Sequence, residues 1–154
     1  MKVGIIGGGR VGSRLATSLR EAGVLAGITA ASEQHSAQLA QQFGVPATDN
    51  AKLWQAADVL LLTVPDRLIG TVAEELAQSV TPAAKVVLHV SGSVGLEPLA
   101  PLTQLGAHVG SLHPLQSFAG GNTQLAGVYM ALDGDSKAQD AGKKLVELFG
   151  GKAF

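Results

Sequence analysis

Three glycines near the N-terminus have the spacing with which a protein backbone can hold a diphosphate. Gly7, Gly9 and Gly12 form the pattern G-x-G-x-x-G. A strand-like run over Lys2–Gly7 leads into the pattern, and a helical period over Arg10–Ala22 follows it. The first glycine permits a tight turn, the second admits the phosphates, and the third lets helix and strand pack closely. The segment predicts a dinucleotide-binding turn, with a purely structural glycine-rich turn as the alternative.

The residues that follow the second glycine would stand beside a bound diphosphate, where helix amides favour negative charge. We expect Arg10 and Val11 to contact the cofactor there, Arg10 through a charge-assisted hydrogen bond. A solvated arginine at the start of a surface helix is the alternative reading of Arg10.

The choice between NAD and NADP depends on the residue about 20 positions after the glycines. An acidic residue there binds the ribose diol of NAD, whereas an arginine accommodates the extra phosphate of NADP. Ser32 stands at this position, and no lysine or arginine lies beside it. Glu33 could serve NAD, and a protonated His35 could meet the phosphate of NADP. We expect Ser32 to contact the cofactor, and the sequence leaves NADP or NAD open.

Further candidates come where other apolar runs end, because parallel strands place ligands at their carboxyl ends. We expect Val64 and Pro65 to line the cofactor cleft and Ser91 to border its nicotinamide end. Histidine is the usual general acid or base near neutral pH, so we expect His113, assisted by Ser91, to be catalytic. A local turn for Ser91 and a structural role for His113 are the alternatives. His89 lies inside a predicted strand and is a weaker candidate.

Apolar runs of strand length alternate with stretches of helical period along the chain. This alternation predicts an α/β fold: a doubly wound, mostly parallel sheet in three layers, the Rossmann arrangement. Further strands are expected over Gly27–Ala31, Val45–Thr48, Val59–Val64, Lys85–Val90, Ala107–Leu112, Val128–Leu132 and Lys152–Phe154. A further helix is expected from Ser32 to Gly44, with Ala37, Leu39, Ala40 and Phe43 facing inward. Three more are expected: one from an N-cap at Asp66 through Leu76, a proline-broken one that ends at Leu105, and one over Ser136–Phe149.

Length and composition favour one domain with a small-molecule ligand. The 154 residues are 46% hydrophobic and 15% charged, with a net charge of −1. The near-neutral charge, spread along the chain, argues against nucleic-acid or anionic-membrane partners. No apolar run approaches the ~18 residues that cross a bilayer, and there is no cysteine for a disulfide or metal site. We expect one cytoplasmic dinucleotide-binding domain over residues 1–154, without a metal site.

Two segments in the second half carry a resemblance to a group of two-domain reductases. Together with the glycine turn, these segments resemble the N-terminal half of pyrroline-5-carboxylate reductases and deazaflavin-dependent NADP oxidoreductases. They are most similar to a Rossmann-like subfamily whose members continue into a helical C-terminal domain. The resemblance covers essentially the whole chain. The segments are His89-Val90-Ser91-Gly92 and Ser111-Leu112-His113-Pro114-Leu115-Gln116.

The resemblance implies an NADP-preferring cofactor domain, joined in the relatives to a helical module that dimerises and closes the active site. The arginine that many relatives carry after the second strand is absent here. We expect the helical domain to be absent from this chain, leaving apolar surface that drives a homodimer or higher assembly. His113-Pro114 is also similar to a segment of prephenate dehydrogenases, whose histidine contacts substrate.

Three functions remain open at this point. The first is the cofactor domain of an oxidoreductase that transfers hydride to or from a small imine, carbonyl or hydroxy substrate, a prephenate-dehydrogenase-like enzyme among them. The second is a catalytically silent nucleotide-binding or regulatory module, because fold alone does not establish activity. The third is a methyltransferase, which can carry a similar glycine turn and would bind S-adenosylmethionine.

Overall fold

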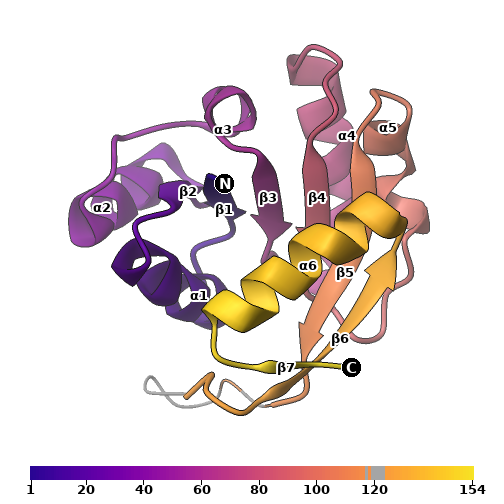
Figure 1. Ribbon diagram of the computed structural model, residues 1–154. Helices are drawn as coiled ribbons and strands as arrows, with labels where there is room; N and C mark the ends of the chain where they lie inside the picture. The colour runs from indigo at the N-terminus through magenta and orange to yellow at the C-terminus, as the bar shows by residue number, and fades with distance from the viewer. Residues whose placement is uncertain (117, 119–123) are drawn as a thin grey trace.

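The computed structural model describes residues 1–116, 118 and 124–154 of the chain. Its described part contains a seven-stranded sheet with the order β2-β1-β3-β4-β5-β6-β7 (Figure 1). The first five strands are parallel, β6 is antiparallel to β5, and β7 is parallel to β6. The strands are β1 (Val3–Ile6), β2 (Leu25–Thr29), β3 (Val59–Leu62), β4 (Val86–His89), β5 (His108–Pro114), β6 (Tyr129–Gly134) and β7 (Lys152–Ala153).

Helices cover both faces of this sheet, so the predicted three-layer, mostly parallel α/β fold is confirmed. One face carries α1 (Arg10–Glu21), α2 (Glu33–Phe43) and α6 (Ser136–Leu148). The other carries α3 (Asn50–Ala56), α4 (Ile69–Ser79) and α5 (Ala100–Thr103), with the 3-10 turns η1 (Asp66–Leu68) and η2 (Glu97–Leu99) before α4 and α5. Within the described ranges, none of the helices combines the length and apolar character that a bilayer span requires.

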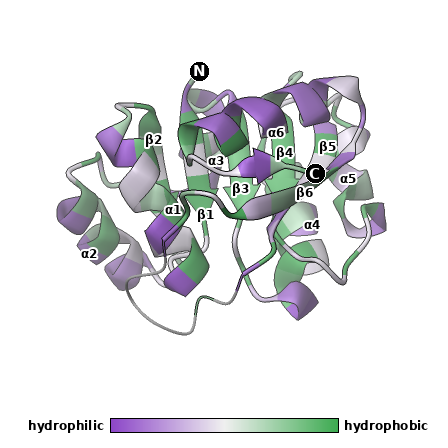
Figure 2. Ribbon diagram, turned by 60° about the horizontal axis from the view of Figure 1, so that its bottom comes forward, coloured by the Kyte–Doolittle hydropathy of each residue, from purple (hydrophilic) through white to green (hydrophobic). Residues whose placement is uncertain are grey.

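The core forms because each central strand sends alternate side chains to opposite faces. In β3, Leu61 packs with α1, α2 and α6, whereas Leu60 and Leu62 pack with the helices on the other face. All three leucines are fully buried, and burying each contributes about 1.5–3 kcal/mol. Figure 2 shows the result, with green strands inside and purple turns on the outer sides of the helices.

The inward face of α2 differs from the prediction at one residue. Leu39 and Phe43 are buried as predicted, but Ala37 is exposed. Ser36 is buried instead, because it lies three residues before Leu39 and seven before Phe43, on the same face of the helix. Its hydroxyl accepts from the Ala30 amide at 2.8 Å and donates to the Ala30 carbonyl at 3.2 Å, which satisfies a polar group in the core.

The strand predicted over Val45–Thr48 is wrong, because this segment is irregular and leads into α3. Pro46 has no amide hydrogen to donate to a ladder. Asp49 then caps α3 by accepting a hydrogen bond at 2.8 Å from the third amide that follows it. Leu53 and Trp54 of α3 are buried against the sheet, so a short amphipathic helix occupies the place of the expected strand.

Two boundaries near the later candidates also differ from the prediction. Asp66 is not the N-cap of α4, because the chain first makes the turn η1 and α4 begins at Ile69. The Asp66 carboxylate accepts a hydrogen bond from the Ser93 hydroxyl instead. His113 lies within β5 rather than after it, because pairing with β6 continues this strand to Pro114.

Candidate functional site

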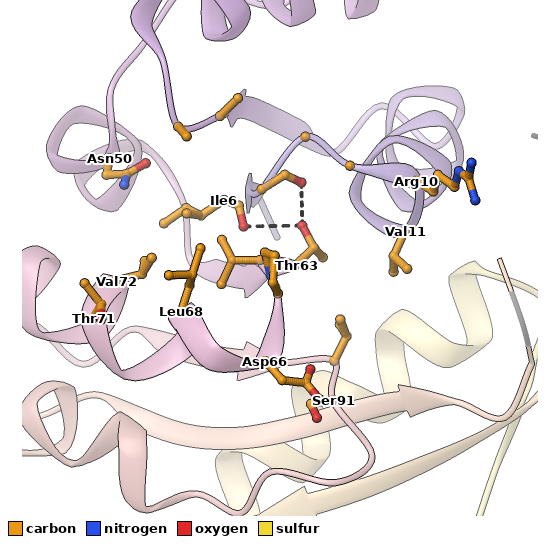
Figure 3. Close-up of a pocket in the computed structure, with 18 of the residues that line it drawn as sticks. Ile6, Arg10, Val11, Asn50, Thr63, Asp66, Leu68, Thr71, Val72 and Ser91 are labelled. Carbon is orange, nitrogen blue, oxygen red and sulfur yellow. Dashed lines mark hydrogen bonds between the residues drawn. The ribbon is translucent and has the colours of Figure 1, made fainter. Parts of the chain in front are cut away.

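A cleft of about 1080 Å³ opens where the parallel strands end (Figure 3). Its floor lies between β1 and β3, which are neighbours although β2 follows β1 in sequence. This is the point at which the chain switches direction across the sheet, and open α/β sheets bind their ligands at such points. The volume is slightly above the ~300–1,000 Å³ typical of small-molecule and cofactor sites. The cleft is therefore large enough for an extended ligand.

The glycine turn at this floor has a separate steric requirement at each glycine. Gly7 has a φ of 122°, and a Cβ there would lie 2.7 Å from the backbone of Thr63. A Cβ at Gly12 would collide with the carbonyl oxygen of Gly7. A Cβ at Gly9 would meet no atom of the described residues within 4 Å, and this glycine lines the cleft. Gly7 and Gly12 thus hold the turn together, whereas Gly9 leaves space beside it.

Helix α1 begins at this turn without a side-chain cap, in contrast to several other helices. Ser32, Asp49 and Asp135 cap α2, α3 and α6 by accepting backbone amides at 2.8–3.0 Å. No described side chain does so for α1, and its first turn contains no acidic residue. The amides of a first helical turn have no partner within their helix. Those of α1 can bind a ligand, and the helix dipole would favour an anionic one.

Thr63 fixes the turn from the neighbouring strand and was not predicted as a site residue. Its Oγ1 lies 2.6 Å from the carbonyl oxygen of Gly7 and 3.3 Å from that of Ile6 (Figure 3). The hydroxyl donates its one hydrogen to the nearer Gly7 carbonyl, with the Ile6 carbonyl as a weaker second acceptor, and ties the end of β3 to the end of β1. Thr63 is the single polar residue in the apolar run over 59–64, and this feature of the sequence could have identified it as a site residue.

His113 lines the cleft, and the Nε2 end of its ring lies against Gly92 in the loop after β4. Its Nδ1 lies 3.0 Å from the carbonyl oxygen of Val90. Because a carbonyl only accepts, Nδ1 carries the hydrogen and Nε2 is left for another partner. A Cβ at Gly92 would strike this ring, so the glycine is required for the ring to sit where it does.

Ser91 sits in the same loop and is nearly buried. Its Oγ accepts the backbone amides of Ser93 and Val94, both at 3.2 Å. The buried His89 lies beneath, where its Nδ1 accepts the Ser91 amide at 3.1 Å and its Nε2 donates to the Gly95 carbonyl at 2.9 Å. Both ring nitrogens of His89 therefore form hydrogen bonds within the loop. This agrees with the sequence analysis, in which His89 is a weaker catalytic candidate than His113.

The opposite end of the cleft lies between β2 and α4. Ala31 and His35 line it, whereas Ser32 does not, because its hydroxyl accepts the His35 amide at 3.0 Å as the cap of α2. Asn50 of α3 also lines this end and accepts the hydroxyl of Thr29 at 2.6 Å. The sequence did not indicate Asn50, because α3 itself was not expected.

The comparisons with known proteins agree with this geometry. A family model described as a Rossmann-like domain matches residues 1–114. The chain belongs to this family. No curated protein matches the sequence.

Solved structures share the fold of this Rossmann-like domain at low sequence identity. A Synechocystis arogenate dehydrogenase is 23% identical, with a TM-score of 0.81 over 100% of this chain and 59% of its own. A 1-pyrroline-5-carboxylate reductase from Streptococcus pyogenes is 22% identical, with a TM-score of 0.76 over 100% and 57%. A prephenate dehydrogenase from Aquifex aeolicus is 23% identical, with a TM-score of 0.76 over 100% and 59%. The chain thus spans less than two thirds of the length of these proteins, and the resemblance to reductases of this group is confirmed for the fold.

The cleft of the Rossmann-like domain brings together most of the residues singled out from the sequence. Gly12 is the exception in the turn, because it packs behind the turn rather than facing the cleft, and Ser32 is the exception at the other end. In Figure 3, Val11 points toward the cleft and Arg10 extends away from the other labelled side chains. The predicted residues that line the cleft are Gly7, Gly9, Arg10, Val11, Val64, Pro65, Ser91 and His113.

An apolar wall on the side of α4 was not predicted. Leu68 of η1 is 36% exposed, and it lines the cleft together with Val72. Figure 3 draws both on the side of Asn50. The cleft of the Rossmann-like domain therefore has an end near α4 where Leu68 and Val72 lie among polar residues, the glycine turn, and a polar end at Ser91 and His113.

Proposed function

We propose that this chain binds NADP or NAD in the cleft and is the cofactor domain of an oxidoreductase. The observation that carries the proposal is the start of α1, where uncapped amides meet the open space beside Gly9. That combination suits a diphosphate, because peptide amides and the helix dipole stabilise its charge and the described residues leave space beside Gly9. The position at the switch point of the sheet suits a dinucleotide that extends to both sides.

Under this proposal, the residues of the glycine turn and the start of α1 contact the diphosphate of the cofactor. Gly7, Gly9 and Gly12 shape the turn that holds the diphosphate, and Arg10 and Val11 adjoin it. Arg10 adds positive charge at the rim of the cleft.

The two ends of the cleft would hold the two nucleosides. Leu68 and Val72 at the end near α4 suit the adenine ring, and His35, which lines the same end, would stand near the adenosine ribose. Ser32 does not line the cleft, but its hydroxyl is hydrogen-bonded to the His35 amide and would lie close by. The Ser32 oxygen accepts the His35 amide, so its hydroxyl hydrogen stays free to be donated. These groups are compatible with either a ribose diol or a phosphate, and the proposal names NADP or NAD.

The polar end would hold the nicotinamide, which supplies the hydride acceptor or donor when it is bound. Val64, Pro65 and Ser91 border this end. His113 is the candidate general acid or base: its Nε2 can take a proton from a substrate hydroxyl in oxidation, or give one in reduction. The bond from Nδ1 to the Val90 carbonyl holds the ring in the tautomer that this role needs.

The related structures support a small substrate of the imine, carbonyl or hydroxy class. The Aquifex aeolicus enzyme was solved with NAD+ and hydroxyphenyl propionate. The Streptococcus pyogenes relative is a reductase of a cyclic imine by its name.

We also propose that residues 1–154 form one dinucleotide-binding domain that associates into a homodimer or higher assembly. Exposed apolar side chains lie at the β6–β7 edge, where the rings of Tyr129 and Phe154 meet edge to face at 6.4 Å. Such patches favour association. Light scattering of the purified chain should give a mass above that of the monomer, and a monodisperse monomer would contradict this.

Parallel titrations with NADPH, NADH and S-adenosylmethionine test the proposed function. We expect a saturable rise in nicotinamide fluorescence with at least one dinucleotide and no competing binding of S-adenosylmethionine. The absence of dinucleotide binding, or a preference for S-adenosylmethionine, would overturn the proposal. Binding without turnover of any imine, carbonyl or hydroxy substrate would favour the silent module.

A further inference from the structure

Three polar side chains form a hydrogen-bonded chain at the polar end of the cleft. The Ser93 Oγ lies 2.9 Å from the Asp66 Oδ2 and 3.4 Å from the Ser91 Oγ. A carboxylate only accepts hydrogen bonds, so the hydroxyl hydrogen of Ser93 is donated to Asp66. Ser93 is therefore left with oxygen lone pairs and presents an acceptor to any further partner. All three residues line the cleft.

Ser91 has the opposite character. Its Oγ has two lone pairs, and both are occupied by the backbone amides of Ser93 and Val94 at 3.2 Å. Only its hydrogen remains, and the Ser93 oxygen at 3.4 Å is farther than the 2.5–3.0 Å of an ordinary hydroxyl–hydroxyl hydrogen bond. Ser91 therefore presents a weakly engaged donor beside the acceptor of Ser93.

We propose that Ser91 and Ser93 recognise a primary carboxamide, that of the nicotinamide ring. A carboxamide carries a carbonyl acceptor and an NH2 donor side by side. The Ser91 hydroxyl donates to the amide oxygen, and the Ser93 oxygen accepts from the amide nitrogen. Asp66 acts through Ser93 as a positioning residue, because it fixes which way the Ser93 hydrogen points. The inference rests on the proposed function and deepens it by naming the groups that orient the ring.

The same loop also contacts the candidate base. Gly92 stands between the two serines, and the ring of His113 packs against it. A ring held by its carboxamide would therefore be fixed relative to the imidazole by one short segment. That segment is itself fixed by His89 below it and by Asp66 from the end of β3.

Binding measurements with cofactor analogues test the carboxamide directly. The ligands are the oxidised dinucleotide that the chain binds better, its 3-acetylpyridine analogue, which keeps the carbonyl but lacks the NH2 group, and ADP-ribose, which lacks the ring. The wild-type chain should bind the natural dinucleotide about three- to tenfold more tightly than the acetyl analogue, as one hydrogen bond allows. Calorimetric titration gives all three dissociation constants.

Variants assign this preference to the serine and the aspartate. Ser93→Ala should abolish the preference for the carboxamide and leave the affinity for ADP-ribose unchanged. Asp66→Ala should weaken the same preference, whereas Asp66→Asn should retain it, because the amide oxygen still accepts the Ser93 hydrogen. Ser136→Ala, a serine exposed at the start of α6, is the matched control and should bind all three ligands like the wild type.

The outcomes separate this inference from the proposed function. Equal affinity of the wild-type chain for the carboxamide and acetyl forms, or a preference that survives Ser93→Ala, would overturn the inference alone. Failure of the wild type to bind either the dinucleotide or ADP-ribose would overturn the proposed function with it. If Ser93→Ala fails to fold, Ser93→Thr decides, since it keeps the hydroxyl: a retained preference supports the inference and a lost one contradicts it.

Discussion

The Nδ1 of His113 donates a hydrogen bond to the carbonyl oxygen of Val90 at 3.0 Å. This bond joins β5 to the loop after β4 and keeps Nε2 available. Gly92 follows in that loop and has no side chain to displace the ring. The orientation of the candidate base therefore depends on a glycine that is not adjacent to it in sequence.

Replacement of Gly92 by alanine should displace the His113 ring, because the added Cβ would strike it. The bond to Val90 would be lost, at a cost of about 1 kcal/mol in the free energy of unfolding. Nitrogen NMR of the imidazole should then show the loss of the hydrogen-bonded Nδ1–H. Gly70→Ala is the control, since its Cβ would make only an ordinary contact with Pro98 at 3.6 Å. Unchanged His113 signals in Gly92→Ala would contradict the prediction.

The glycines of the turn should differ in their effect on stability. Gly12→Ala places a Cβ against the carbonyl oxygen of Gly7 and should cost about 1–3 kcal/mol in the free energy of unfolding, as overpacking does. Gly9→Ala adds a Cβ to open space and should change that free energy by less than about 0.5 kcal/mol. Urea denaturation of the two variants measures the difference. Equal losses would show that the turn is not packed as described.

Thr63 should contribute through its hydroxyl rather than through its size. Thr63→Val keeps the volume but removes the donor to the Gly7 and Ile6 carbonyls, which should cost about 0.5–1.5 kcal/mol. Thr63→Ser keeps the donor and should lose less. Thermal unfolding of both variants checks the order, and a valine variant as stable as the wild type would refute the role of the hydroxyl.

Asp135 should make stability depend on pH in the acid range. Partial burial raises the pKa of this carboxyl, but hydrogen bonds from the Ala138 amide and His108 outweigh burial and lower the pKa below its ordinary value of 3.8. A lowered folded-state pKa means that the stabilisation is fully present above the unfolded pKa and is lost as pH falls through the folded one. Asp135→Asn keeps a good helix cap without the titrating group. The stability difference between wild type and variant should therefore shrink as pH falls from about 5 to about 3, and a constant difference would contradict this.

Local patterns predicted the strand–turn–helix at the N-terminus and the three-layer fold well. Buried strands such as β3 are short apolar runs, and the glycine spacing reflects steric demands within a few residues. The strand expected over Val45–Thr48 failed because an apolar residue beside Pro46 does not show which backbone groups pair. Helix α3 carries only Leu53 and Trp54 to the core, too few for a clear helical period.

The polar end of the cleft could be predicted only in part. Ser91 and His113 were recognised because each follows or closes an apolar run. The contact between Ser93 and Asp66 joins residues 27 positions apart, on loops after two neighbouring strands. Strand order brings these loops together, and the sequence alone does not give the rotamers that make them meet. The sequence therefore predicted the loops at this end of the cleft, but not the side-chain contacts between them.

Dinucleotide affinity of a Gly9→Val variant is the most direct test of binding at the start of α1. The added side chain enters the open space beside the turn, so the variant should fold like the wild type yet bind NADPH or NADH about 10- to 100-fold more weakly, as expected from the loss of charge-assisted hydrogen bonds. Gly70→Ala should bind like the wild type. A folded Gly9→Val variant with undiminished affinity would contradict the proposal that the diphosphate lies against this turn.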